Sequence, residues 1–131
     1  ELLLTPVGID EGNTVEDRYK LAIQCSDFLK QVGKKPKIAI LAEGREDDFG
    51  RGSEVANSIK ESKKLTKLIK EQTDEEVENY FILIEKAINS KSNIIIAPNG
   101  RVGNIIFRTD STMFRVVFVH IEHIGIFGDV P

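Results

Sequence analysis

Short apolar runs alternate with longer segments of helical periodicity along this chain, and this alternation limits the possible folds more than any other feature. Buried strands are predicted over residues 2–7, 37–42 and 93–97. An amphipathic helix is predicted over residues 14–32, and Ser53 is predicted to cap a second helix. Strands that alternate with helices form βαβ units. The expected fold is therefore α/β, a three-layer Rossmann-like domain with a mostly parallel sheet.

The segment after the second helix has two interpretations. Thr73 and Glu76 form a capping-box pattern, and apolar residues follow at helical spacing as far as Ile88. The same segment contains YFILI, residues 80–84, which also suits a short buried strand. Periodicity does not distinguish a helix from a strand over so short a run.

The C-terminal part of the chain is predicted to contain one more helix and one more strand. The helix is expected to open over residues 103–108. Residues 115–127 are rich in Val, Ile and Phe and predict a strand that is broken at Gly125.

Composition excludes several classes of protein. The 131 residues are 40% hydrophobic and 30% charged, which suits one globular domain with a core. The net charge of −3 argues against nucleic-acid or anionic-membrane binding, and no apolar run reaches the roughly 20 residues of a membrane span. The single cysteine, Cys25, precludes an internal disulfide and suits the cytoplasm. The chain opens inside an apolar run without a methionine, so we expect it to be part of a longer protein.

Three loops that follow predicted strands are the most unusual parts of the sequence. They span residues 8–13, 43–52 and 98–104. Ligands of parallel α/β sheets bind beyond the carboxyl ends of the strands, and all such loops emerge at one edge. These loops are therefore the place to look for a binding site.

The loop PNGRVGN combines turn-forming residues with an arginine. Gly100 and Gly103 allow either a tight turn or a close approach of the backbone to a ligand. Arg101 offers a bidentate fork to phosphate or carboxylate, and Asn104 could cap a helix or touch a ligand. The alternative is a plain Pro-Asn-Gly turn with a helix cap. The Gly-Lys-Ser/Thr of a P-loop is absent.

The loop EGREDDFGRG is dense in charge. Arg45 and Arg51 flank the acidic residues Glu46, Asp47 and Asp48. The arginines could bind an anion, and the acids could hold Mg²⁺ or orient the arginines. The alternative is a solvated charged loop, and its glycines predict mobility without a ligand.

The remaining candidates carry weaker signals. Asp10 and Glu11 lie in the first loop, where a carboxylate could act as an acid or base or could accept hydrogen bonds from loop amides. His120 and His123 stand three apart in a strand pattern, so they point to opposite faces and do not predict a shared metal. Cys25 lies on the apolar stripe of its helix and is interpreted as a core residue.

Two segments together resemble a known superfamily. LLLTPVGIDEGNTVEDRYKLAIQCSDFLKQVGKKPKIAILAEG and SNIIIAPNGRVGNIIFR resemble the phosphate acetyl/butyryltransferases. Within this superfamily the chain is most similar to the methanogen MtxX-like family, which is labelled as a methyltransferase subunit. The similarity lies in TPVGIDEG, in the Gly-Arg, Asp and Gly-Arg positions of the charged loop, and in IIAPNGRVGNIIFR. The resemblance covers residues 2–108.

The resemblance implies a fold, a function and a set of residues. The fold would be part of an isocitrate/isopropylmalate dehydrogenase-like (phosphotransacetylase) fold, with this chain as its C-terminal part and residues 110–131 as a poorly matched tail. A strand over residues 80–83 and a helix from residue 85 are favoured over one helix. The implicated residues lie in the loops after strands: Asp10, Glu11, Gly44, Arg45, Asp48, Gly50, Arg51, Pro98, Gly100, Gly103 and Asn104.

The function implied is that of a methyltransferase-related subunit of methanogen metabolism, with an anion or cofactor site at the strand-end loops. The cofactor is unknown, no catalytic residue is assigned and no metal is expected. The partners implied are a small anionic or phosphate-bearing ligand and a second copy in a homodimer, without nucleic acid or membrane.

Two alternatives stay open. The first is a phosphate acyltransferase that acts on acyl-CoA and phosphate, although the chain lacks that group's Asp-Leu-Ser-Arg-Gly segment and has Asn99 where an Asp is usual. The second is a non-catalytic binding or assembly subunit. We expect residues 43–52 and 98–104 to face each other and form one anion site, with Arg51 or Arg101 supplying the charge.

Overall fold

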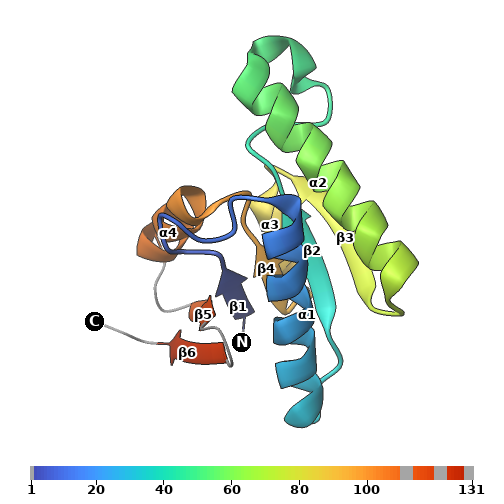
Figure 1. Ribbon diagram of the computed structural model, residues 1–131, viewed down its shortest axis with the longest axis vertical. Helices are drawn as coiled ribbons and strands as arrows, with labels where there is room; N and C mark the ends of the chain where they lie inside the picture. The colour runs from blue at the N-terminus through green and yellow to red at the C-terminus, as the bar shows by residue number, and fades with distance from the viewer. Residues whose placement is uncertain (1, 110–113, 120–123, 129–131) are drawn as a thin grey trace.

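The structure, a computed structural model, describes residues 2–109, 114–119 and 124–128 (Figure 1). In these residues six strands form one sheet in the order β3-β2-β4-β1-β5-β6. The strands are β1 (Leu2–Thr5), β2 (Lys37–Leu41), β3 (Glu76–Phe81), β4 (Ile94–Ile96), β5 (Phe114–Val119) and β6 (Ile124–Gly128). The helices are α1 (Val15–Gln31), the 3₁₀ turn η1 (Asp48–Arg51), α2 (Ser53–Gln72), α3 (Ile84–Asn89) and α4 (Gly100–Thr109).

The predicted parallel sheet is confirmed. β4 lies between β2 and β1 and pairs with both in parallel, so that Ile94 is opposite Leu3 on one side and Ile38 on the other. β3 and β5 extend the sheet in parallel at its two sides, and β6 adds an antiparallel strand. The three strands predicted first are therefore neighbours at the centre of the sheet.

Alternate residues of each strand face different helices, which gives three layers. Ile38 and Ile40 of β2 belong to the core cluster that packs under α1 and α2. Ala39 and Leu41 belong to the cluster that packs under α3 and α4. Because β4 is buried on both faces, its sequence is a continuous apolar run instead of an alternating one.

Helix α1 has the ends that its sequence predicts. The backbone N–H of Asp17 donates to the Thr14 hydroxyl oxygen over 3.0 Å, which caps the first turn. Gly33 ends the helix with a φ of +79°, and the N–H of Lys34 reaches back to the carbonyl of Leu29 over 2.8 Å.

The segment after α2 forms a strand, β3, followed by the short helix α3, as the resemblance implies. β3 begins and ends earlier than the expected residues 80–83. The predicted N-terminal cap at Thr73 is wrong. Thr73 closes the C-terminal end of α2, where its hydroxyl donates to the Ile69 carbonyl over 2.8 Å. Pairing with β2 makes this segment a strand, because Val77 is the one buried residue of β3 and the strand carries little apolar signal of its own.

Two predicted helix starts need correction. Helix α4 begins at Gly100, three residues earlier than expected, because Asn99 caps it through a 2.9 Å bond from the Val102 N–H to its side-chain oxygen. Ser53 is the first residue of α2 and not its cap, since Gly52 occupies the capping position and supplies no side chain.

The C-terminal strand prediction was also incomplete. Residues 114–119 and 124–128 are two antiparallel strands, and Gly125 lies inside β6 instead of breaking it. The segment between them, with His120, Glu122 and His123, lies outside the described residues. Among the residues that are described, no helix is long and apolar enough to cross a membrane.

Candidate functional site

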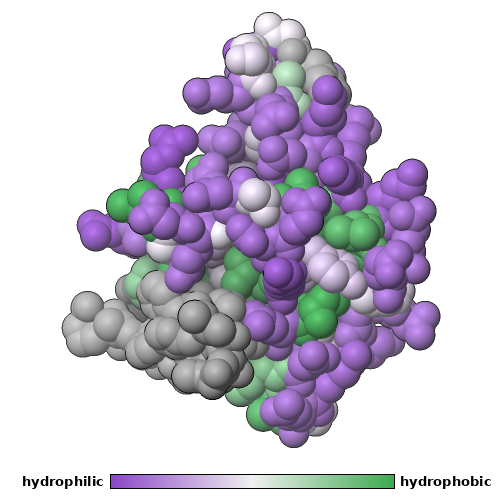
Figure 2. Space-filling model, viewed as in Figure 1, coloured by the Kyte–Doolittle hydropathy of each residue, from purple (hydrophilic) through white to green (hydrophobic). Residues whose placement is uncertain are grey.

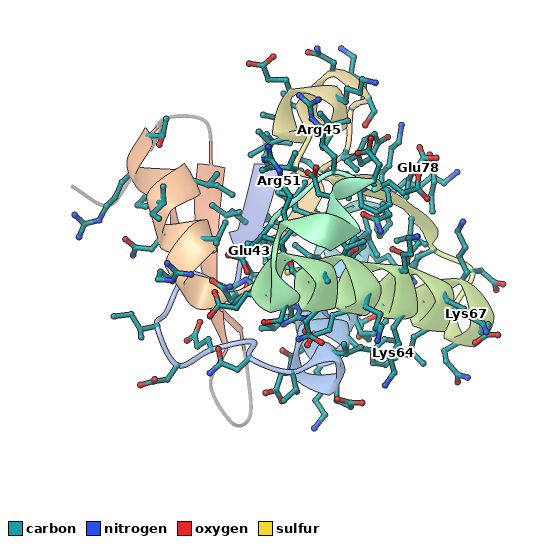
Figure 3. All side chains as sticks on the ribbon, turned by 90° about the horizontal axis from the view of Figure 1, so that it is seen from above. Glu43, Arg45, Arg51, Lys64, Lys67 and Glu78 are labelled. Atoms are coloured by element: carbon teal, nitrogen blue, oxygen red, sulfur yellow. The ribbon has the colours of Figure 1, made fainter. Side chains whose placement is uncertain are left out.

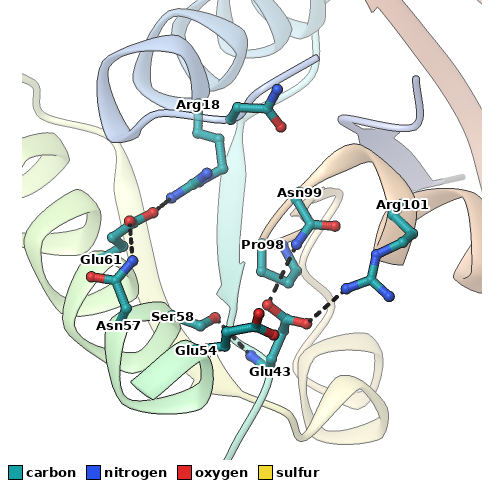
Figure 4. A pocket seen from close by; sticks show the side chains of 10 residues that line it. Arg18, Glu43, Glu54, Asn57, Ser58, Glu61, Pro98, Asn99 and Arg101 are labelled. Carbon is teal, nitrogen blue, oxygen red and sulfur yellow. Dashed lines mark hydrogen bonds and ion pairs between the residues drawn. The ribbon is translucent and has the colours of Figure 1, made fainter. Parts of the chain in front are cut away.

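A polar pocket of about 300 Å³ lies at the carboxyl edge between α1, α2 and the start of α4 (Figure 4). Hydrophilic residues cover most of the surface above this edge (Figure 2). The pocket is lined by Asn13, Arg18, Glu43, Glu54, Asn57, Ser58, Glu61, Pro98, Asn99 and Arg101. Side chains from four separate segments of the chain, at residues 13–18, 43, 54–61 and 98–101, therefore meet in one place.

The sheet topology explains why a pocket forms here. β1 and β4 are neighbours, but the chain leaves β1 toward α1 on one face and leaves β4 toward α4 on the other. Loops that depart in opposite directions leave a crevice between them, which is where ligands bind in open α/β sheets.

The glycines of the loop PNGRVGN bring α4 against the loop that follows β1. A Cβ on Gly100 would lie 1.5 Å from the carbonyl oxygen of Gly8, and one on Gly103 would lie 1.8 Å from that of Pro6. Asn104 adds a 3.4 Å hydrogen bond from its side-chain amide to the Val7 carbonyl. In this structure the close backbone approach that the glycines permit is therefore to another part of the chain.

The loops after β2 and β4 do meet, and the residue that joins them is Glu43. One carboxylate oxygen of Glu43 lies 3.6 Å from Nη2 of Arg101, and the other accepts from the Asn99 amide over 3.4 Å. The backbone N–H of Glu43 donates to the Ser58 hydroxyl over 2.9 Å. Glu43 thus links the two loops to α2, as Figure 4 shows.

The opposite wall of the pocket is built around Arg18, which is only 4% exposed. Its guanidinium donates to the Gly12 carbonyl over 2.6 Å and forms an ion pair with Glu61. Glu61 also accepts from the Asn57 amide over 2.8 Å. A buried charge needs such partners, and these fix the start of α1 against α2.

Neither Glu43 nor Arg18 was predicted from the sequence as a site residue. Arg18 did carry a signal, because it stands three residues after Val15 and four before Ala22 on the buried stripe of α1. A charged residue at a core position calls for a buried partner. Glu43 has no such signal, since a glutamate that follows a strand is an ordinary loop residue.

The pocket is not a positively charged site. It holds three carboxylates, Glu43, Glu54 and Glu61, and two guanidinium groups, so its formal lining charge is −1. Each guanidinium already has a carboxylate partner. Glu54 lies in the first turn of α2, where the helix dipole favours a negative charge.

The two arginines of the charged loop do not line the pocket. Asp48 organises this loop, since its carboxylate accepts from the Arg45 N–H over 2.7 Å and lies 3.9 Å from Nε of Arg51. Seen from above the carboxyl edge, Arg45 and Arg51 project from the loop next to Glu43 (Figure 3). Gly44 serves packing, because a Cβ there would lie 2.6 Å from a methyl group of Val55.

The acidic residues of the first loop are also outside the pocket. Asp10 is exposed. Glu11 is half-buried, and its buried oxygen Oε2 has no hydrogen-bond partner among the described residues. Over all the residues that the structure describes, no group of three or more His, Cys, Asp or Glu side chains is placed to hold a metal ion.

Cys25 lies in the core beneath α1 and is fully buried. Burial raises the pKa of its thiol from 9.0 to about 12 by desolvation. The thiolate is the nucleophilic form of cysteine, so this side chain has no catalytic character at neutral pH.

These features define the chain as an α/β protein of the Rossmann-like type, with a polar, nearly charge-balanced pocket at the point where the sheet reverses its strand order. No family model matches the chain.

The chain is similar to several curated proteins of methanogens. It is 39% identical over 106 residues to a Methanosarcina barkeri protein named "Putative methyltransferase mtx subunit X". The aligned residues make up 81% of this chain and 38% of that protein. A Methanopyrus kandleri protein named as an uncharacterized methyltransferase is 37% identical over 108 residues, 82% of this chain and 41% of the relative. A protein of the same description from Methanocaldococcus jannaschii is 37% identical over 111 residues, 81% of this chain and 45% of the relative. The chain spans less than half the length of these relatives.

Proposed function

We propose that this chain is the ligand-binding part of a methyltransferase-related subunit of the MtxX type in methanogen metabolism, and that the pocket at the carboxyl edge binds a small polar ligand. The observation that carries the proposal is the meeting of Arg18, Glu43, Glu61, Asn99 and Arg101 at the switch point of the sheet. The similarity to relatives whose names include methyltransferase supports the assignment to that class.

The first candidate ligand has an anionic group that binds at Arg101. The side chain of Arg101 is 68% exposed, and its ion pair with Glu43 is 3.6 Å long. A surface ion pair of this kind contributes little, so a phosphate or carboxylate can compete for the guanidinium. Arg101 also lies in the first turn of α4, where free backbone N–H groups favour an anion.

The second candidate ligand has a positively charged group, and the excess of carboxylates over guanidinium groups favours it. Of the three lining carboxylates, Glu61 is paired with the buried Arg18, which leaves Glu43 and Glu54 for a ligand. A methyl group becomes transferable when it is bound to a positively charged sulfur or nitrogen, so a sulfonium or methylammonium ligand would fit both the charge of the pocket and the class of the relatives.

We also propose that the complete protein has the larger isocitrate/isopropylmalate dehydrogenase-like fold, because the relatives are more than twice as long as the matched segment. A non-catalytic binding subunit would use the same pocket. No observation favours a phosphate acyltransferase.

Isothermal titration calorimetry separates the two ligand classes. Phosphate, pyrophosphate and coenzyme A form the anionic set, and tetramethylammonium and trimethylsulfonium form the cationic set. If the anionic group binds at Arg101, Arg101→Ala should weaken binding about tenfold, since a charge-assisted bond at an exposed site contributes at the low end of its range. If a cation binds, Glu54→Gln should weaken it by a similar factor.

Arg45→Ala is the matched control, because Arg45 is an exposed arginine of the neighbouring loop and does not line the pocket. It should bind either ligand class as the wild type does. The proposal fails if neither set binds the wild type at low-millimolar concentration, or if both pocket variants bind as well as the wild type.

A further inference from the structure

A second concave surface lies between α2 and β3, away from the pocket at the carboxyl edge. It has a volume of about 490 Å³ and shares no lining residue with that pocket. Its lining consists of Lys63, Thr66, Lys67, Lys70 and Glu71 from α2, Asn79 and Phe81 from β3, and Glu46 from the loop after β2. We call it the α2–β3 groove. β3 is the end strand of the sheet, and α2 lies beside it (Figure 1).

The groove carries an excess of positive charge on an acidic chain. Its lining has three lysines and two carboxylates, Glu46 and Glu71, which gives a formal charge of +1, whereas the whole chain has a net charge of −3. Lys63, Lys67 and Lys70 have the spacing that places side chains on one face of a helix.

Two of these lysines are available to a ligand. Lys63 forms an ion pair of 3.5 Å with Glu46 at the rim. Lys67 and Lys70 have no ion-pair partner in the part of the chain that the structure describes. The helix dipole favours a positive charge at Lys70, which lies in the last turn of α2. It does not explain the lysine at position 67, because Lys67 is more than one turn from the helix end at Gln72.

The floor of the groove contains an aromatic ring in an unusual backbone position. Phe81 has a φ of +56°, a conformation that bulky residues rarely adopt, at the point where the pairing with β2 shifts register. Asn79 holds it there, since its side-chain oxygen accepts from the Phe81 N–H over 2.9 Å and its amide donates to Ser62 over 2.9 Å. Backbone outliers of this kind concentrate at binding sites.

We propose that the α2–β3 groove binds a free nucleotide, with the base against the ring of Phe81 and the phosphates at Lys67 and Lys70. A half-buried aromatic ring offers a stacking surface to a planar base. Two unpaired ammonium groups match the charge of phosphates, and the aliphatic stems of the lysines extend the apolar floor. The volume is in the range of small-molecule sites.

Calorimetry on the full chain at an ionic strength of about 0.15 M tests the proposal, because this salt screens non-specific attraction. The probes are adenosine triphosphate, tripolyphosphate, adenosine and a short single-stranded oligonucleotide. Adenosine triphosphate should bind at least several-fold more tightly than either tripolyphosphate or adenosine. Equal binding of tripolyphosphate overturns the role of Phe81, and tighter binding of the oligonucleotide overturns the free nucleotide as the ligand.

The variants assign the binding to the groove. Lys67→Ala combined with Lys70→Ala should weaken binding of adenosine triphosphate about tenfold or more, and Phe81→Leu should weaken it by a similar factor. Lys64→Ala is the matched control, because Lys64 also projects from α2 but does not line the groove (Figure 3). The exposed lysines do not support the fold, so the double variant remains decisive even if Phe81→Leu unfolds.

Arg101→Ala should bind adenosine triphosphate as the wild type does, which separates this inference from the function proposed for the carboxyl edge. Wild-type binding by the double lysine variant would overturn the inference, as would an equal loss in the Lys64→Ala control.

Discussion

Gly100 and Gly103 lie where the first turn of α4 crosses the loop after β1, and no larger residue fits at either position. The atoms that a Cβ would meet belong to the backbone, at 1.5 Å and 1.8 Å, so no side chain can rotate away to relieve the clash. The start of α4 would have to move, and Arg101 and Asn99 would move with it.

We therefore predict that Gly100→Ala and Gly103→Ala each destabilise the protein by at least 1–3 kcal/mol, the usual cost of overpacking, and lower the melting temperature by roughly 5 °C or more. Thermal denaturation followed by circular dichroism measures this. Gly50→Ala is the control, because a Cβ at Gly50 meets nothing within 4 Å. A Gly103→Ala protein as stable as the wild type would mean that α4 does not pack as the structure has it.

Cys25 should make the stability of the folded protein depend on pH in the alkaline range. Its folded pKa of about 12 lies above the ordinary value of 9.0 because the thiolate would be desolvated. The folded state therefore holds its proton where the unfolded state loses it. This contribution to stability is fully present below pH 9 and is lost progressively as the pH rises from 9 toward 12.

We predict that urea denaturation shows a fall in stability above pH 9 that is smaller in Cys25→Ala than in the wild type, although the variant is less stable at neutral pH because it leaves a cavity. Alkylation by iodoacetamide gives a second readout, slow in the folded protein and fast in urea. Rapid alkylation without denaturant would show that the thiol is not buried.

Helix α1 connects the central strand β1 to β2 and supports one wall of the pocket through Arg18. Its N-terminal cap is made by the side chain of Thr14. Helix α2 starts with a serine that looks equivalent in the sequence, but Ser53 makes no capping bond. The two helices thus offer a matched comparison within one molecule.

Thr14→Ala should cost about 1 kcal/mol of stability, and Ser53→Ala should cost much less. Chemical denaturation of both variants measures the difference. Equal losses in the two variants would contradict the assignment of Thr14 as the cap.

In the sheet of this molecule the central strands pair with a strand on each side, whereas β3 is an end strand. Ile94, Ile95 and Ile96 of β4 are 0% exposed and pair with strands on both sides. β3 pairs on one side only, in the residues described, and Glu76 and Glu78 of this strand are exposed. Local opening should therefore be rare at the centre and frequent at the edge.

Amide hydrogen exchange tests this order. We expect the slowest exchange in β4 and β2, faster exchange in β3, and the fastest in residues 43–52, whose amides make few hydrogen bonds within regular structure. A ligand of the carboxyl-edge pocket should slow exchange near Glu43. Slow exchange over residues 43–52 in the free protein would rule out the mobility expected of that loop.

The sequence by itself determined the elements whose signals are local. The strands β1, β2 and β4 contain uninterrupted apolar runs at residues 2–4, 38–41 and 94–96, which stand out without knowledge of their neighbours. Thr14 and Gly33 mark the ends of α1 because a hydroxyl that accepts from an N–H three residues on, and a residue with positive φ, act within one turn of helix.

Only the tertiary structure decided what depends on a neighbour distant in the chain. β3 is a strand because it pairs with β2, since its own residues, with Val77 alone fully buried, do not specify it. Glu43 joins two loops because β2 and β4 end side by side, and Arg101 faces the pocket because Asn99 starts α4 three residues before the predicted position. The glycines could be recognised from sequence as a requirement for close approach. That the approach is to the backbone of Pro6 and Gly8 follows only from the packing of α4 on β1, because contact between residues almost a hundred positions apart leaves no local pattern.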